Sequence, residues 1–211
     1  MLEKIIYILG FAFLFYVGYY LINLIGIFKK RKKVTNNNDD KKNFFAVIVA
    51  ARNEENVIGK LIDSLKKQSY PSEYFDIYVI VNNCTDNTAI DAKKAGAKVI
   101  SCTEKVSTKG EVLKYTFDLF KDNNKIDAYA IFDADNIVHH DFLAKMNDMI
   151  NSGYSVAQGF RDTKNISDNW LTSSYAILYY FQSLFLNESR YNMGRSSFLN
   201  GTGFVLSLIH I

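Results

Sequence analysis

The chain has 211 residues, 48% apolar and 22% charged, which excludes an intrinsically disordered, collagen-like or disulfide-stapled protein. Seven basic and only two acidic residues fall between residues 29 and 42, so this segment has a net charge of +5. The net charge of the whole chain is +3, so the rest of the chain has a net charge of −2. A basic face for nucleic acid is therefore not expected. Cys84 and Cys102 lack the spacing of a metal site, which suits a reducing compartment.

The first predicted element is a membrane-spanning helix. Residues 5–28 contain no charged side chain, and a helix of that length exceeds a hydrocarbon core of about 30 Å. A cleaved signal peptide is the alternative, but it requires a basic segment before a shorter apolar core. Here the basic run follows, at 29–33. We therefore expect residues 1–28 to be a retained single-pass anchor in the cell membrane, with everything after Phe28 in the cytoplasm.

Residues 29–43 are predicted to be a basic and polar linker, and residues 44–211 a folded domain. Short apolar runs in that domain predict strands at 44–51, 75–82, 97–101, 128–133 and 154–159. Amphipathic stretches with helical spacing separate the first four runs, and another follows the fourth. Nearly continuous apolar strands that alternate with helices predict an α/β fold, with a mostly parallel sheet and helices on both faces.

Polar residues gather where three of these predicted strands end. The first strand ends in the sequence ARNEE, the second in NNCTD and the fourth in DADN. The carboxyl ends of the strands in an open α/β sheet line one crevice, where ligands bind. Three strand ends rich in hydrogen-bonding groups therefore predict a ligand site along this edge.

The DADN stretch is the strongest candidate for chemistry. Asp133 and Asp135 follow an apolar strand and offer hard oxygen ligands to Mg²⁺ or Mn²⁺. Such a metal completes its shell with phosphate oxygens and neutralises charge on a pyrophosphate leaving group. The alternative is an Asp that caps a helix beginning near His140.

Two further segments have the chemistry of a nucleotide site. Arg52 is able to stack on a base or to reach a phosphate, and Glu54 is able to accept a hydrogen bond from a base or a ribose. The alternative is that Asn53 caps a helix whose first turn carries acidic residues. Lys109 stands before Gly110 at the start of a predicted helix, where a cation suits a phosphate contact.

Other features favour structural roles. Asp86 is interpreted as part of a turn and helix cap. His139 and His140 lie at a predicted helix start, where adjacent side chains face differently, and are interpreted as surface residues and not metal ligands. A long helical stretch from Asp168 to about Arg190 is rich in aromatic residues, which favours a core position or a face at the membrane. The sequence NGTGF at 200–204 indicates either a close backbone approach to a ligand or a simple turn.

Taken in order, these residues resemble the family 2 glycosyltransferases with the GT-A fold, particularly their membrane-anchored, polysaccharide-synthesising branch. The motifs AARNEE, NNCTDNT, KG, FDADN and NGTGF occur in the family's order and approximate spacing, across roughly residues 44–206. The resemblance implies that a sugar is transferred with inversion from a nucleotide-diphosphate sugar, usually a UDP-sugar, to a glycan or lipid acceptor. It also implies Mg²⁺ or Mn²⁺ as the cofactor.

The resemblance implies seven residues that bind the nucleotide-sugar: Ala51, Arg52, Glu54, Asn82, Lys109, Asp133 and Asp135. Among them Asp135 is expected to bind the metal, Asp133 to contact the ribose and Lys109 to approach the diphosphate. Asn82 stands where many members have an Asp that contacts the base. An amide keeps an acceptor, adds a donor and removes a charge, so Asn82 presents a different hydrogen-bonding pattern to the base from that of an Asp.

The resemblance implies a catalytic base downstream of the NGTGF loop, in an acidic motif. An inverting transfer needs this carboxylate to take the proton of the acceptor hydroxyl. After Gly203 the chain continues only from Phe204 to Ile211, without a carboxylate. We therefore expect the base to lie beyond Ile211 and the domain to be incomplete at its carboxyl end.

Three other classes of protein share parts of this pattern. A noncatalytic, membrane-anchored module that binds a nucleotide-sugar or a partner needs no base. A sugar-phosphate nucleotidylyltransferase requires a glycine-rich loop after the first strand, but this chain has the sequence ARNEE there. A haloacid-dehalogenase phosphatase places its Asp-x-Asp motif on the first strand, but in this chain the motif follows the fourth strand.

Overall fold

The computed structural model describes residues 2–29, 34, 41–104 and 106–209. They divide into two compact units, each described here by itself. One unit comprises Met1–Lys33 and Phe160–Phe198, and the other comprises Val34–Gly159 and Leu199–Ile211. The predicted folded domain is thus interrupted by residues 160–198, which cluster with the N-terminal helix.

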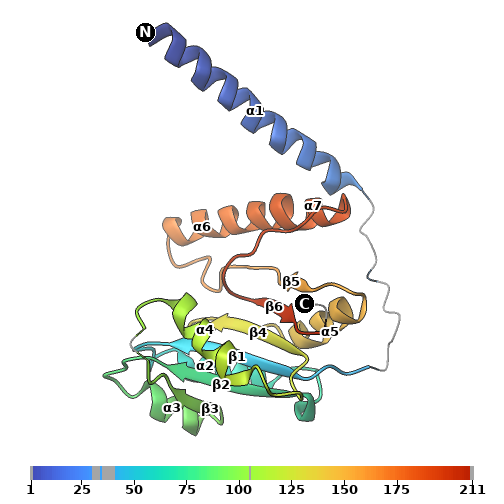
Figure 1. Ribbon diagram of the computed structural model, residues 1–211. Helices are drawn as coiled ribbons and strands as arrows, with labels where there is room; N and C mark the ends of the chain where they lie inside the picture. The colour runs from blue at the N-terminus through green and yellow to red at the C-terminus, as the bar shows by residue number, and fades with distance from the viewer. Residues whose placement is uncertain (1, 30–33, 35–40, 105, 210–211) are drawn as a thin grey trace. The chain divides into compact units, whose positions relative to one another are not determined.

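The larger unit contains a six-stranded sheet in the order β3-β2-β1-β4-β6-β5 (Figure 1). Its strands are β1 (Phe45–Ala51), β2 (Phe75–Val81), β3 (Lys98–Ser101), β4 (Ala128–Asp133), β5 (Val156–Gln158) and β6 (Phe204–Ser207). The first four strands are parallel, and β6 pairs antiparallel with both β4 and β5. This is the mostly parallel sheet that the sequence predicts.

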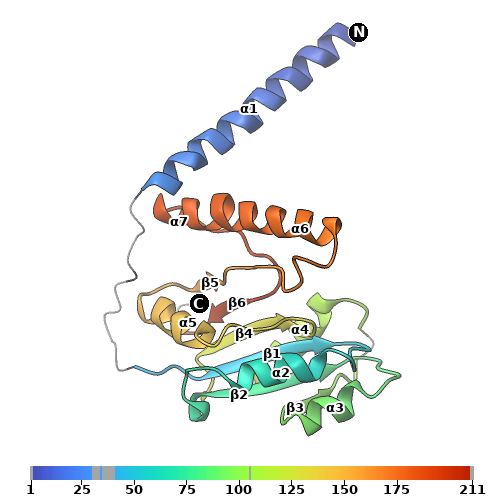
Figure 2. The same ribbon diagram turned by 180° about the vertical axis from the view of Figure 1, so that it is seen from behind.

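Helices cover both faces of this sheet, as predicted. They are α2 (Ile58–Lys66), α3 (Thr88–Lys94), α4 (Lys109–Phe120) and α5 (Phe142–Asn151), with a short 3-10 turn at Ser72–Tyr74. The alternation of side chains along β1 explains the two layers: Val47 and Val49 pack with α2 and α5, whereas Ala46 and Ile48 pack with α4. Figure 1 shows the α4 face and Figure 2 the α2 face.

The strand β6 is absent from the sequence prediction. It has only four residues, and its pairing partners β4 and β5 lie far upstream in the chain. Antiparallel pairing with such distant strands leaves no local signal in the sequence. Its position beside β4 is nevertheless important, because it brings the preceding loop to the end of β4.

Asn43, placed by the sequence analysis at the end of the linker, is fully buried and bound to α5. Its backbone N–H and its side-chain Nδ2 both donate to Oδ1 of Asn147, at 3.0 and 2.8 Å. The Tyr70 hydroxyl donates to the Asn43 carbonyl at 2.7 Å, and Asn147 Nδ2 donates to the carbonyl of Lys41 at 3.0 Å. The chain is therefore fixed to α5 before β1 begins.

The smaller unit consists of helices. The helix α1 spans Leu2–Phe28, and a continuous helical stretch comprises α6 (Trp170–Phe181), a π-helical segment (Gln182–Glu188) and α7 (Ser189–Asn192). Within α1, residues Glu3–Phe28 are long and apolar enough to cross a membrane. The basic residues 30–33, on which the predicted orientation depends, lie outside the described residues.

Candidate functional site

The predicted site residues lie at the carboxyl ends of three neighbouring strands. In the register of the sheet Ala51 pairs with Val81, and Ala50 pairs with Asp133. The strands β2, β1 and β4 therefore end at nearly the same level. The backbone N–H of Asn82 donates to the carbonyl of Ala51 at 3.1 Å and extends this alignment by one residue. The structure thus places all three polar segments along one edge.

The loops after β1 and β2 are fixed to each other by hydrogen bonds. The backbone N–H of Glu54 donates to Oγ1 of Thr88 at 2.7 Å, and that of Thr85 donates to Oδ1 of Asn53 at 2.8 Å. Asn53 and Asn83 have φ angles of 58° and 49°, a region that asparagine tolerates better than most residues. Each strand therefore ends in an abrupt turn, which the cross-links between the loops hold in place.

Asp86 is part of this connection, in agreement with the structural role expected for it. Its carboxylate accepts from the backbone N–H of Thr88 at 3.1 Å and from that of Glu55 at 3.1 Å. Burial opposes the charged form, but hydrogen bonds from Thr88 and Glu55 hold the pKa of Asp86 below its usual value. Asp86 remains charged and tethers the two loops.

A second network joins the end of β4 to the NGTGF loop. The backbone N–H of Asp133 donates to Oγ1 of Thr202 at 2.8 Å, and the Thr202 hydroxyl donates to Oδ1 of Asn136. Lys109 Nζ donates to Oδ1 of Asp133 at 2.5 Å and to the carbonyl of Gly201 at 2.7 Å. Gly201 has a φ of 76° and open space beside it, so the structure shows the turn that the sequence also allows here.

Lys109 begins α4, as predicted. Thr108 caps the helix by accepting from the backbone N–H of Glu111, and the Glu111 carboxylate accepts from the N–H of Thr108 at 2.9 Å. This capping box fixes where α4 starts, so the ammonium group of Lys109 reaches Asp133 from a rigid support. The sequence does not reveal the pairing of Lys109 with Asp133, because 24 residues separate them.

Asn82 is 5% exposed and leaves one buried atom without a partner in the described part of the chain. Its Nδ2 donates to the carbonyl of Val106 at 3.2 Å, whereas Oδ1 accepts no hydrogen bond from the described residues. The donor that distinguishes Asn from Asp is thus used within the fold. The atom of Asn82 that is left without a partner is an acceptor, as it would be in an Asp.

Glu54 connects the two networks electrostatically. Burial raises the pKa of its carboxyl group, and the negative charges of Asp135, Asp86 and Asp133 raise it further. These carboxylates converge strongly enough to disfavour ionisation of a neighbour. A carboxyl group with a raised pKa at the ligand-binding edge of an α/β sheet is a candidate functional residue.

This electrostatic conflict predicts a stabilising substitution, Glu54→Gln, when no metal is present. A carboxyl group whose pKa is raised by folding binds its proton more tightly in the folded chain. The contribution of Glu54 to the free energy of unfolding is therefore greatest below its ordinary pKa of 4.5, and it is lost as the pH rises through the raised pKa of the folded state. Glutamine does not titrate, so the variant should be the more stable protein at neutral pH and should lose this advantage below pH 4.5.

Urea unfolding followed by circular dichroism at the two pH values checks this expectation. Glu55→Gln serves as the matched control, because Glu55 Oε2 accepts from the backbone N–H of Asn87 at 2.8 Å and its neutralisation should not stabilise. A gain for Glu54→Gln that is independent of pH would contradict the electrostatic explanation.

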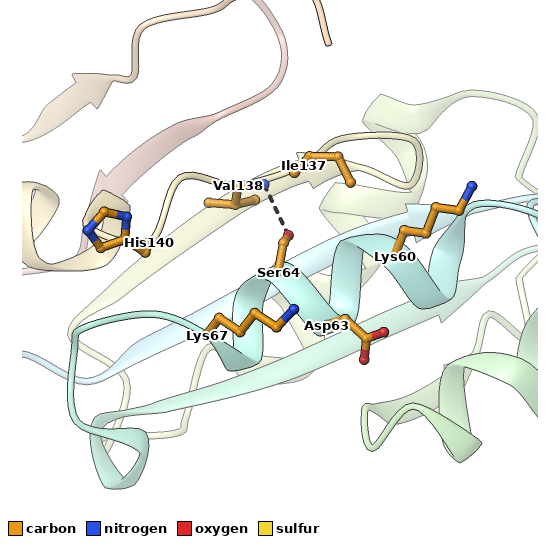
Figure 3. Close-up of a pocket in the computed structure, with 7 residues that line it drawn as sticks. All are labelled: Lys60, Asp63, Ser64, Lys67, Ile137, Val138 and His140. Carbon is orange, nitrogen blue, oxygen red and sulfur yellow. Dashed lines mark hydrogen bonds between the residues drawn. The ribbon is translucent and has the colours of Figure 1, made fainter. Parts of the chain in front are cut away.

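A separate groove lies between α2 and the segment that leads from β4 to α5 (Figure 3). It is lined by Lys60, Asp63, Ser64, Lys67, Ile137, Val138 and His140. The backbone N–H of Val138 donates to Oγ of Ser64 at 3.0 Å across it, drawn as the dashed line. None of the predicted nucleotide-site residues lines this groove.

His139 and His140 are exposed, as predicted, but their rings do not face different ways. The ring centroids are 4.3 Å apart, because both residues precede α5, which begins only at Phe142. Together with Asp141 they form a group whose ligand atoms lie within 4.8 Å of one another and which is able to hold a metal ion. Sequence reasoning missed this group because it assumed helical geometry at that point.

The sheet order defines the fold class, which is the GT-A fold. A mannosyltransferase from Pyrobaculum calidifontis, solved with GDP-mannose and Mn²⁺, is similar with a TM-score of 0.67 at 16% identity over 90% of this chain. Glucosyl-3-phosphoglycerate synthase from Mycobacterium tuberculosis, solved with Mn²⁺, UDP and phosphoglyceric acid, is similar with a TM-score of 0.55 at 21% identity over 84% of this chain.

The sequence profile of the glycosyltransferase-like family 2 matches residues 42–208. The chain therefore belongs to this family, as the ordered motifs indicate. It spans 51% of the length of the mannosyltransferase and 61% of that of the synthase. No curated protein matches the chain in sequence.

Proposed function

We propose that this chain is the donor-binding part of a membrane-anchored, inverting glycosyltransferase. It binds a nucleotide-diphosphate sugar, with UDP as the favoured nucleotide, together with Mg²⁺ or Mn²⁺, and serves the synthesis of a cell-surface or extracellular glycan on a glycan or lipid acceptor. The observation that carries the proposal is the convergence of Glu54, Asp133 and Asp135 beside Lys109 at the ends of β1 and β4.

The residues at this edge fit a divalent metal. Asp135 is exposed and supplies hard carboxylate oxygens, and the raised pKa of Glu54 reveals negative charge that a cation would neutralise. Mg²⁺ and Mn²⁺ need few protein ligands when phosphate oxygens complete the shell. When bound, the metal would neutralise the charge that develops on the nucleoside diphosphate as it leaves.

The chain's own residues bind and position the donor. Lys109 supplies a positive charge for the diphosphate, and its bond to Asp133 keeps both groups at the end of β4. Arg52 is exposed at the end of β1, where a guanidinium group suits a contact with the base or a phosphate. The hydrogen bonds between the loops after β1 and β2 hold these groups in place before the donor arrives.

Membrane attachment through residues 1–28 is part of the proposal, with the larger unit in the cytoplasm, where the nucleotide-sugar would be bound. The length and apolar character of α1 support it. The basic run that follows, at 29–33, supports a cytoplasmic position for the rest of the chain. Residues 29–43 then connect the anchor to the nucleotide-binding unit.

Binding of nucleotides to the chain in membranes tests the proposed function. UDP, GDP, ADP and their sugar conjugates are titrated with Mn²⁺, with Mg²⁺ and with a chelator. We expect a uridine nucleotide to bind best and to require the metal. If no nucleoside diphosphate bound under any of these conditions, a noncatalytic module that binds a protein partner would replace the proposal.

Asn82 is expected to decide how well the base is held. Asn82→Asp keeps the acceptor and should bind UDP nearly as well as the native chain. Asn82→Leu removes it and should weaken UDP binding about tenfold, the effect of one hydrogen bond of about 1.4 kcal/mol. Calorimetric titration of UDP in Mn²⁺ compares the variants, and equal affinities for Leu and Asn would remove Asn82 from the site.

A further inference from the structure

The smaller unit has no apolar core among its described residues, 2–29 and 160–198. Its buried residues are small or polar: Asn23, Gly26, Ala176, Ser183 and Ser189. The larger unit has the opposite arrangement, with side chains such as Phe45, Ile48 and Leu61 fully buried. Small and polar residues between helices, with large apolar ones outside, are typical of helices packed in lipid.

The helix α6 exposes most of its large apolar side chains. These are Trp170, Leu171, Tyr175, Ile177, Leu178, Tyr180 and Phe181, each with about half or more of its surface accessible. No charged residue occurs from 169 to 187. Trp170, Leu178 and Phe181 recur at helical spacing and form one continuous stripe. An exposed apolar surface of this extent marks a contact with a membrane or a partner.

The helical stretch that begins with α6 ends with α7, and α7 contacts the candidate membrane span α1. In Figure 1 the helix α7 lies against the C-terminal part of α1. Ser189 donates its hydroxyl to the carbonyl of Asn23, and a side chain at Gly26 would collide with Ser189. The two backbones therefore approach as closely as small residues permit.

Longer polar side chains complete the same junction. Arg190 Nη1 donates to the Tyr19 hydroxyl at 2.6 Å, and Asn192 Nδ2 donates to the carbonyl of Gly26 at 3.1 Å. These bonds hold α7 beside residues 19–26, the last two turns of the apolar helix. If α1 lies in the bilayer, the C-terminal end of the attached stretch, α7, lies near the membrane surface.

We propose that α6 lies in the interface of the lipid bilayer, with its stripe of exposed apolar side chains inserted among the lipid chains. This second membrane contact rests on the proposed anchoring by α1. Among the described helices only α1 combines the length and hydropathy needed to span a membrane. The helix α6 instead carries Trp170 and three tyrosines, the side chains that favour the boundary between lipid and water.

The occupant of this surface is lipid and not a second protein, because the stripe is continuous with a helix that is itself apolar on all sides. Arg161 stacks on the ring of Tyr179 in the last turn of α6, 4.1 Å from its centroid, and Arg190 lies in α7. Cations beside an apolar stripe suit an interfacial helix, since they reach the head groups while the stripe enters the lipid.

Trp170 is the only tryptophan of the chain and is 79% exposed at the start of α6, so its fluorescence reports on this surface alone. The full chain is reconstituted into vesicles whose lipids are brominated either near the head group or near the end of the acyl chain. We expect strong quenching by the shallow bromines, weak quenching by the deep ones and little quenching by aqueous iodide.

A second variant distinguishes the insertion of α6 from the insertion of α1. In the double variant Trp170→Phe, Leu14→Trp the reporter lies in the middle of α1, and the deep bromines should quench it most. If they do while Trp170 is quenched by iodide and not by bromine, α1 is an anchor and α6 lies in water, which overturns the inference. Shielding of Trp170 from both quenchers would also overturn it, since a protein would then cover the surface.

Discussion

Replacing Asp135 with asparagine is expected to weaken the Mn²⁺-dependent binding of UDP at least about 100-fold. Loss of groups that merely orient a metal ligand already costs 10- to 100-fold in metal affinity, as an order of magnitude, and Asp135 is proposed to be the ligand itself. The amide lacks the negative charge that holds a hard cation. Calorimetric titration of UDP into the chain, with Mn²⁺ and with a chelator, measures the difference.

Asp118→Asn is the matched control, because this carboxylate is exposed on α4 and away from the strand ends. It should bind UDP as the native chain does. If Asp135→Asn bound UDP with undiminished metal dependence, Asp135 would not be the metal ligand. Equal loss in both variants would indicate that overall charge, and not a specific site, controls binding.

Replacing Asn147 with leucine is expected to lower the free energy of unfolding of the larger unit by about 2–4 kcal/mol. Leucine has a similar size but accepts no hydrogen bond, so the backbone N–H of the fully buried Asn43 loses its partner. A buried donor without a partner costs about 1–3 kcal/mol, and the lost bonds to Asn43 Nδ2 and Lys41 add to this.

Urea unfolding followed by circular dichroism measures this loss. Lys145→Ala is the control on the same helix, since its side chain is exposed and surface changes stay within about 0.5 kcal/mol. If the urea midpoint of Asn147→Leu equalled that of the native chain, the hydrogen bonds between α5 and the segment before β1 would not stabilise the fold. A loss of the same size in both variants would point to the helix and not to the bonds.

The sequence was most informative where local patterns decide structure. The strands at 45–51, 75–81 and 128–133 and the helices between them follow from apolar runs and helical spacing. The placement of Glu54, Asn82 and Asp133 at one edge followed in turn, because parallel strands all end on the same side. The family followed from the order of the motifs, each of which is weak alone.

What the sequence could not provide depends on contacts between distant segments. The pairing of Lys109 with Asp133 joins α4 to the end of β4, and the bonds from Thr202 to the end of β4 depend on the antiparallel pairing of β6 with β4. The burial of Asn43 depends on α5, about a hundred residues later. Propensity and periodicity describe local neighbours, and these bonds form only after the chain has folded.

Iron-directed cleavage of the backbone locates the bound metal. Fe²⁺ replaces Mn²⁺ in the presence of UDP, and ascorbate and peroxide then generate radicals that cut the nearest peptide bonds. A metal–nucleotide site at the strand ends predicts cuts around residues 133–136 and 200–202 that require the nucleotide. Cleavage confined to 139–141, next to His139, His140 and Asp141, and independent of UDP would contradict a metal–nucleotide site at the strand ends.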